Sequence, residues 1–351
     1  MKSLTRSRKM TSTNAQFHGQ LFLLLILLAR LRVSNNEKNI EEDKVCCVKT
    51  QSSPHRAESV GEFEITAKRI NSSNIKSSMK MKSQQKRTKV GDRTIVSIPP
   101  ERALVIDGGI LGSKRHIIYG LVEVDVTRAR EIRRNQENKV SFTAYLVACL
   151  ARAVEKHPDV QAYKIGRKYI IFDNVDVSTM IEAEKGGVAI PHILRNANLR
   201  SVRDISDEIQ KIKSCPEQSE QNSGNLAKKA LKVPRWVRMI FYQCMKRDPD
   251  MIRDKMGTVM LTSVGMFGNG NGFGITYMPL HTLGLTVGGI QTKPGYIHGE
   301  VVPREYLSIT MAFDHDIVDG APAARFAKDL VAFIQDGRLM LDEKREEKAD
   351  S

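Results

Sequence analysis

Cysteine is scarce in this sequence and irregularly placed. The five residues are Cys46, Cys47, Cys149, Cys215 and Cys244. Their number is odd and no C-x-x-C pair occurs, so a zinc site is disfavoured and we predict no metal. Scattered thiols fit a reducing compartment better than a disulfide framework, and a cytoplasmic location is therefore the first expectation.

Long apolar runs are also lacking. The run from Leu21 to Ala29 has nine residues, too few to span a bilayer. Basic residues precede it, as in a signal peptide, but Arg30 and Arg32 follow directly and no small-residue cleavage site is evident. Three interpretations stay open at this point. The run is a membrane-associated segment, it belongs to a peptide that targets an organelle matrix, or translation starts at Met79 or Met81.

Acidic residues are too few to balance the basic ones, and the net charge is +15. Residues 1–84 carry 15 Lys and Arg against 7 Asp and Glu, so more than half of the excess lies in the first quarter of the chain. Such a segment suits nucleic acid or an anionic membrane, but no recognition motif with interleaved aromatic residues supports nucleic acid as a partner. We expect residues 1–90 to be a basic, disordered extension, 91–340 a folded domain and 341–351 a charged tail.

Periodic patterns begin near residue 94 and alternate between strands and helices. Strands are predicted at 121–126, 175–183, 258–264, 283–290 and 306–313, where apolar residues alternate or run continuously. Helices are predicted at 141–157, 199–213 and 321–335, the last with Pro322 in its first turn and Gly337 just past its end. This order, without internal repeats, predicts a mixed α/β sandwich rather than a Rossmann pattern.

The segment Phe313–Phe326, FDHDIVDGAPAARF, contains the most informative motif. A strand ends there, His315 follows, and Asp319-Gly320 opens a helix. We expect the Asp319 side chain to cap this helix and to fix the loop that presents His315. A histidine titrates near neutral pH and can therefore act as a general base.

This H-x-x-x-D-G arrangement resembles the active-site signature of the 2-oxo acid dehydrogenase acyltransferase (E2) catalytic domain, which is related to chloramphenicol acetyltransferase. Three upstream segments resemble the same family in the expected order: His116–Arg130, Gly186–Val202 and Gly257–Gly268. The resemblance covers about residues 95–338. It implies a two-layer α/β sandwich of the CoA-dependent acyltransferase type, and a homotrimer with active sites at subunit interfaces.

The resemblance also implies roles for individual residues. His315 would be the general base, and the oxyanion donor would be Thr262 or its neighbour Ser263, with Thr262 favoured. Asp319 would be structural and pair with an arginine, for which Arg102 is the candidate. The implied substrate is an acyl-coenzyme A, and the implied acceptor is a dihydrolipoamide-like thiol on a lipoylated protein or another small acceptor.

The chain departs from the family pattern in three places. Asp316 stands where the family usually has Arg, no lipoyl domain precedes the catalytic region, and the 214–256 segment is longer than the corresponding loop. We therefore expect no lipoyl group on this chain, and a non-catalytic, trimeric partner-binding scaffold remains the alternative function. Within the long segment, Lys228, Lys229 and Lys232 adjoin an apolar cluster from Val233 to Phe241. The cluster either docks on the core with its cations in water, or covers the acyl channel with the lysines on the phosphates of coenzyme A.

Overall fold

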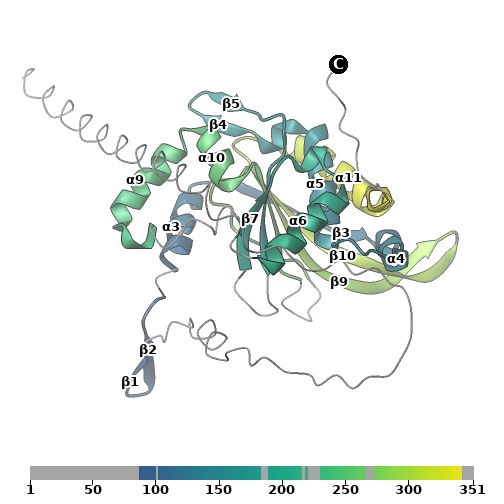
Figure 1. The fold of residues 1–351 in the computed structure, drawn as a ribbon, viewed down its shortest axis with the longest axis horizontal. Coiled ribbons are helices and arrows are strands. Elements are labelled where there is room, and N and C mark those ends of the chain that lie inside the picture. The colour runs from purple at the N-terminus through teal and green to yellow at the C-terminus, as the bar shows by residue number, and fades with distance from the viewer. Residues whose placement is uncertain are drawn as a thin grey trace, which may run out of the picture. The chain divides into compact units, whose positions relative to one another are not determined.

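The structure is a computed structural model that describes residues 87–99, 102–182, 189–215, 218–219, 230–265 and 272–341. Within these residues a six-stranded mixed sheet has the order β3, β10, β9, β8, β6, β7. Its strands are β3 (Ile117–Asp125), β6 (Val177–Glu182), β7 (Ala189–Leu194), β8 (Val259–Ser263), β9 (Leu283–Ile297) and β10 (Glu300–Asp314). One face is covered by the helices α4 (Thr127–Asn135), α5 (Phe142–Lys156), α6 (Val202–Ser214) and α11 (Gly320–Asp336) (Figure 1). The predicted two-layer α/β sandwich is confirmed.

The main core lies between the sheet and these helices. Alternate residues of β10, such as Ile309 and Phe313, face it together with Phe326, Leu330 and Ile334 of α11. Each of these side chains is almost fully buried, and burying one contributes about 1.5–3 kcal/mol relative to exposure. Alternation of this kind is what the sequence predicted for the strands.

Local signals also explain where the helices begin and end. Ser201 caps α6: its hydroxyl accepts a hydrogen bond from the Asp204 backbone N–H, and the Asp204 carboxylate accepts one from the Ser201 backbone N–H. Gly337 ends α11 with a φ of 72°, a left-handed conformation that glycine adopts without steric cost. Helices α5, α6 and α11 agree with the three predicted helices to within three residues, whereas α4 was not predicted.

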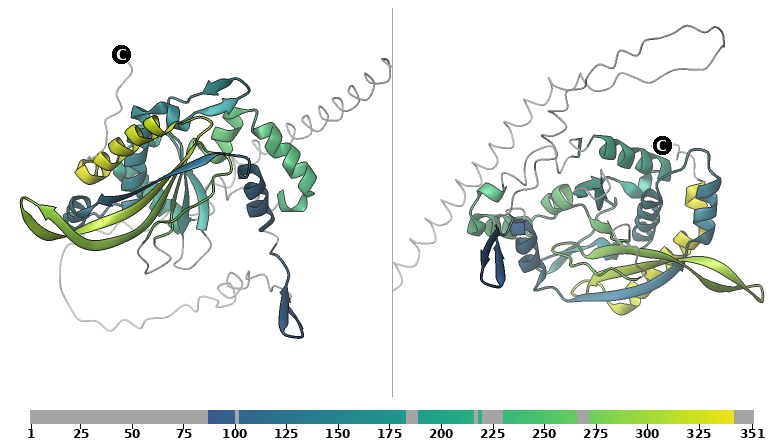
Figure 2. Two further views of the ribbon diagram at one scale, coloured as in Figure 1. Left: turned by 180° about the vertical axis from the view of Figure 1, so that it is seen from behind. Right: turned by 90° about the horizontal axis from the view of Figure 1, so that it is seen from below.

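The opposite face of the sheet is covered in part by the segment that precedes β9. A Cβ at Gly284 would lie 2.5 Å from the Met278 sulfur, so a larger residue there would displace the Met278 side chain. Strands β9 and β10 extend further than predicted, and their far ends pair only with each other in a hairpin that runs past the helix layer (Figure 2).

Two further helices contribute Met245 and Ile252 to a second, smaller cluster of buried residues. Helix α9 (Arg235–Met245) starts directly after Pro234, and α10 (Pro249–Met256) has Pro249 in its first turn. Proline lacks the N–H that a helix interior needs but is suited to the first turn, so both boundaries follow from the sequence. Helix α3 is Arg102–Gly112, and like α9 and α10 it was not among the predicted helices.

The remaining described elements are short. They are the hairpins β1 (Arg87–Val90)–β2 (Arg93–Val96) and β4 (Tyr163–Ile165)–β5 (Lys168–Ile170), and single 3-10 turns at Pro158–Gln161, Ala197–Leu199 and Arg338–Met340. Strand β1 thus falls inside the segment predicted to be disordered. Residues 1–86, with the apolar run of the N-terminal segment, lie outside the described residues. No helix in the described part of the chain is long and apolar enough to cross a membrane.

Candidate active site

His315 follows the last residue of β10, directly opposite His116, which precedes the first residue of β3. The backbone N–H of His315 donates to the carbonyl oxygen of His116 at 2.7 Å. The His315 side chain is 46% exposed, so its imidazole is accessible to a substrate. A central strand and an edge strand therefore hold the backbone of His315 while its ring stays free.

The residue before His315, Asp314, belongs to a part-buried ion pair. The Arg115 guanidinium donates through Nε to Oδ2 of Asp314 at 2.8 Å, and its Nη2 contacts the same oxygen. The two side chains are only 13% and 7% exposed. This pair fixes the residue before His315, and it was not predicted. The sequence offered only one signal for it, an acidic residue next to the motif histidine.

Asp319 lies at the N-cap position of α11, as predicted, but its side chain makes no capping hydrogen bond. Its Oδ1 is instead 3.9 Å from Nδ1 of His315, and the carboxylate is 83% exposed. The capping prediction is therefore wrong, because the carboxylate turns towards the imidazole rather than towards the helix N–H groups. The predicted pairing with Arg102 is also absent among the described ion pairs; the arginine that reaches this motif is Arg115.

Asp316 is hydrogen-bonded to two other segments of the chain and to Asp314 of its own segment. Its Oδ1 is 2.8 Å from Nδ1 of His116, its backbone N–H donates to Oδ1 of Asp314, and its carbonyl oxygen accepts from the Tyr169 hydroxyl at 3.1 Å. The hydrogen bond from His116, with nearby Lys164 and Arg115, lowers the pKa of Asp316 below its usual value. Asp316 is therefore a carboxylate anchored beside His315.

Thr262 and Ser263 end strand β8 on opposite faces of the sheet. Val259 and Leu261 face the helix layer and belong to the core, so alternation turns Thr262 to the other face and Ser263 to the helix side. Both residues are half-buried. Thr262 pairs in register with Thr286 of β9, and the Thr286 side chain is buried.

One copy of the chain does not bring Thr262 and His315 together. Phe313 lies opposite Leu283, whereas Thr262 lies opposite Thr286, and β9 separates their strands. The two positions are thus about 10 Å apart along the sheet and about 10 Å across it. His315 lies beyond Phe313, away from Thr262, which adds roughly another 6 Å. A chemical step that uses both the His315 and the Thr262 side chains therefore needs a second copy of the chain.

The predicted phosphate-binding lysines are only partly visible. Lys228 and Lys229 lie outside the described residues, and Lys232 is exposed just before Pro234. Helix α9 does not simply dock its apolar side on the core: Arg238 is buried and donates to Asp107 of α3 at 2.8 Å, while Trp236 is 66% exposed. The expectation that all cations would lie in water is wrong, because the buried Asp107 needs a cationic partner.

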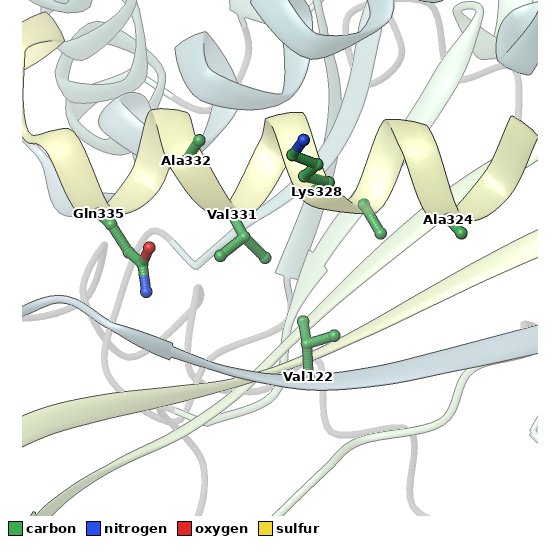
Figure 3. Close-up of a pocket in the computed structure, with 7 residues that line it drawn as sticks. Val122, Ala324, Lys328, Val331, Ala332 and Gln335 are labelled. Atoms are coloured by element: carbon green, nitrogen blue, oxygen red, sulfur yellow. The ribbon is translucent and has the colours of Figure 1, made fainter. Parts of the chain in front are cut away.

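A shallow groove of about 480 Å³ lies elsewhere, between α11 and β3. Figure 3 shows Val331 of α11 pointing towards Val122 of β3 across it. The groove is lined mainly by small and apolar side chains and contains none of the predicted site residues.

The pattern of the family described as 2-oxoacid dehydrogenases acyltransferase (catalytic domain) matches residues 113–227 and 249–341 of this chain. The chain belongs to this family. The matched blocks contain Thr262, Ser263, His315 and Asp319. The unmatched residues 228–248 contain α9 and the three lysines, in agreement with the longer segment noted in the sequence.

Curated relatives in this acyltransferase family are distant. The dihydrolipoyllysine-residue succinyltransferase component of the mitochondrial 2-oxoglutarate dehydrogenase complex of Saccharomyces cerevisiae is 25% identical over 62% of this chain and 42% of that protein. The dihydrolipoyllysine-residue acetyltransferase component of the pyruvate dehydrogenase complex of Rickettsia bellii is 23% identical, over 68% of this chain and 52% of that protein. The chain spans about half the length of these relatives.

Solved structures support the same fold. A probable dihydrolipoamide acetyltransferase from Listeria monocytogenes 4b F2365 superposes with a TM-score of 0.52 at 22% identity, over 70% of this chain and 95% of that one. The cubic core of a pyruvate dehydrogenase multienzyme complex gives a TM-score of 0.53 at 18% identity, over 72% and 98%. The predicted acyltransferase type of sandwich is thereby confirmed.

Proposed function

We propose that this chain transfers an acyl group between coenzyme A and a thiol acceptor, with His315 as general base. The observation that carries the proposal is the position of His315. Its ring is accessible, its backbone is bonded to β3, and a part-buried ion pair, Arg115–Asp314, fixes the preceding residue. Such rigid presentation of an accessible imidazole is what proton transfer from a bound substrate requires.

The proposed reaction has two steps. His315 accepts the proton of the acceptor S–H, and the resulting thiolate attacks the carbonyl carbon of the acyl-CoA thioester. The tetrahedral oxyanion accepts a hydrogen bond from the Thr262 hydroxyl, with Ser263 as the second candidate. The bond between carbon and the CoA sulfur then breaks, and the CoA thiolate takes the proton back from His315. The net reaction exchanges one thioester for another.

The proposed site is shared by two copies of the chain. His315 and Thr262 of one copy are too far apart to act on one carbonyl group, by the register of β8, β9 and β10. A closed ring of identical subunits would place His315 of one copy near Thr262 of the next at every interface. We propose a homotrimer, as the family resemblance implies.

The acceptor and the acyl carrier are also proposals. The two curated relatives are named for dihydrolipoyllysine residues, which makes a dihydrolipoamide-like thiol on a lipoylated protein the first acceptor to test. Lys228, Lys229 and Lys232 remain proposed contacts for the phosphates of coenzyme A. Changing all three to Gln should raise the KM for acyl-CoA, and this effect should shrink at high salt.

The proposal is tested by incubating the full chain with acetyl-CoA, succinyl-CoA and longer acyl-CoAs. Free dihydrolipoamide, a lipoylated protein domain and simple amines and alcohols serve as acceptors, and free CoA is measured over time. We expect acceptor-dependent release of CoA with the thiols. The control is His298→Asn, which removes an exposed histidine from the β9–β10 turn.

The alternative function has a distinct result in the same assay. A trimer that releases no CoA with any acceptor, but that retains a lipoylated protein, would be a partner-binding scaffold. Release of CoA that is independent of an acceptor thiol would indicate hydrolysis and contradict the proposed transfer.

A further inference from the structure

The residue after His315 is held more firmly than its exposure suggests. Asp316 contacts two residues that are distant in sequence, His116 before β3 and Tyr169 on β5, and it also bonds to Asp314 two residues before it. The β4–β5 hairpin that carries Tyr169 is itself rooted in the core, because the buried Tyr163 hydroxyl donates to the carbonyl oxygen of Gly257 at 3.0 Å. Asp316 therefore connects the His315 turn to a rigid frame.

The His116 side chain has a defined hydrogen-bonding state when its ring is neutral. A carboxylate oxygen only accepts, so the Nδ1 that faces Asp316 carries the hydrogen. Nε2 is then left with its lone pair, on a ring that is 77% exposed.

The charges around Asp316 are unequal. The segment before β3 contributes Lys114, Arg115 and His116, and strand β4 contributes Lys164; Asp314 of β10 and Asp319 of α11 are the facing carboxylates. Arg115 is already paired with Asp314, and no ion pair of Lys114 or Lys164 is present among the described residues. Among these groups, only His116 is hydrogen-bonded to the Asp316 carboxylate through its side chain, so its protonation would add a positive charge in direct contact with Asp316.

We propose that His116 and Asp316 form a positioning pair for His315. The pair holds the His315 turn through the His116 Nδ1–Asp316 Oδ1 hydrogen bond, and the Asp316 carboxylate stabilises the imidazolium that forms when His315 accepts a proton. This proposal rests on the proposed function, in which His315 is the base. Neither residue of the pair needs to touch the substrate.

Protonation of His116 then has a functional consequence. When His116 is neutral, the pair carries one negative charge beside His315. When His116 is protonated, the pair is neutral and stabilises the His315 imidazolium less. The rate should therefore fall at acid pH for two reasons, protonation of His315 itself and neutralisation of Asp316 by His116.

The test compares His116→Ala, His116→Asn and Asp316→Ala, with His298→Asn as the control for loss of an exposed histidine. Asparagine retains an N–H donor for Asp316 but cannot be protonated. At alkaline pH we expect His116→Ala and Asp316→Ala to lower kcat roughly twofold to fivefold with little change in KM, and His116→Asn to match wild type. At acid pH we expect His116→Asn to exceed wild type by about the same factor.

A double-variant cycle completes the kinetic test. His116→Ala/Asp316→Ala should be no slower than either single variant, because each single change already breaks the pair. Additive losses, or a His116→Asn variant as slow as His116→Ala, would overturn the proposal and indicate that the imidazole of His116 contacts the substrate directly.

NMR spectroscopy of the histidine side chains separates this proposal from the proposed function, since it needs no turnover. In wild type the neutral His116 ring should show hydrogen on Nδ1, the nitrogen that faces Asp316. In Asp316→Ala this preference for Nδ1 should be lost, and the His298 ring should be unchanged. A His116 ring that is the same in both proteins would overturn the positioning pair even in an active enzyme. A chain that shows this change but no acyl transfer would retain the pair and refute only the function.

Discussion

Arg115, which precedes β3, forms an ion pair with Asp314, the last residue of the neighbouring strand β10. The Arg115 Nε is 2.8 Å from the Asp314 Oδ2, and both side chains are largely buried. Asp314 directly precedes His315 in the sequence. The ion pair couples the stability of the fold to the placement of the candidate base.

Removing one partner of this pair should destabilise the protein strongly. We expect Arg115→Ala to lower the free energy of unfolding by about 3–5 kcal/mol, because an uncompensated carboxylate is left buried. Denaturant titration measures this loss. The control is Arg93→Ala, which breaks an ion pair with Asp92 whose side chains are 87% and 93% exposed. That change should cost less than about 1 kcal/mol. Equal losses for the two variants would show that the Arg115 pair is not buried in solution.

Asp319 should contribute little to stability, because its side chain caps nothing. We expect Asp319→Asn to change the free energy of unfolding by less than about 0.5 kcal/mol. Ser201→Ala is the matched comparison, since the Ser201 hydroxyl does cap a helix, and it should cost about 1 kcal/mol. Thermal melts of both variants measure the difference. If Asp319→Asn were less stable than Ser201→Ala, the Asp319 side chain would have a capping role after all, and this prediction would be wrong.

Thr262 and Ser263 should differ in their effect on rate. Thr262→Val retains the branched shape and removes only the hydroxyl, and we expect kcat to fall about 10²–10³-fold, the cost of one oxyanion donor. Ser263→Ala should change kcat much less, because Ser263 faces the helix layer. Steady-state kinetics with saturating acyl-CoA measure both. The reverse order would make Ser263 the donor.

His281 should make stability fall at acid pH. Its ring is buried, its Nε2 is 2.8 Å from the Met256 carbonyl oxygen, and burial lowers its pKa to about 4. Unfolded chains therefore bind a proton that the folded protein does not, between the ordinary histidine pKa of about 6.5 and about 4. The resulting loss of stability begins as pH drops below about 6.5 and reaches roughly 3 kcal/mol near pH 4.

The check on His281 is urea denaturation of wild type and His281→Gln at several pH values. Glutamine can donate to the Met256 carbonyl oxygen but does not titrate, so the pH dependence between these limits should be reduced in the variant. If both proteins lose stability in parallel, other groups cause the acid sensitivity.

Much of the fold could be predicted from local patterns. Helices α5, α6 and α11 and the core strands have regular spacing of apolar residues, because each buries one face against the other layer. The extra length of β9 and β10 was missed, since their far ends pair outside the core and carry no alternating apolar pattern. Strand β1 was missed for the same reason: it is exposed and has no apolar face.

The site was predictable only in part. His315 could be found from its motif, because its neighbours in sequence are also its neighbours in space. The pairs Arg115–Asp314 and His116–Asp316 join residues about 200 positions apart. Only the register between β3 and β10 brings them together, and no spacing within one segment reveals that register. Likewise, the separation of Thr262 from His315 depends on strand order rather than on sequence distance.

The most direct test of the shared active site mixes two variants that are each inactive, His315→Ala and Thr262→Val. Co-expressed chains that assemble at random should regain about a quarter of the wild-type rate, because about one interface in four pairs an intact His315 with an intact Thr262. The control mixes each variant with itself after the same treatment. Recovery of activity is the result that this account predicts. Mixed oligomers that stay as inactive as either variant alone would contradict it.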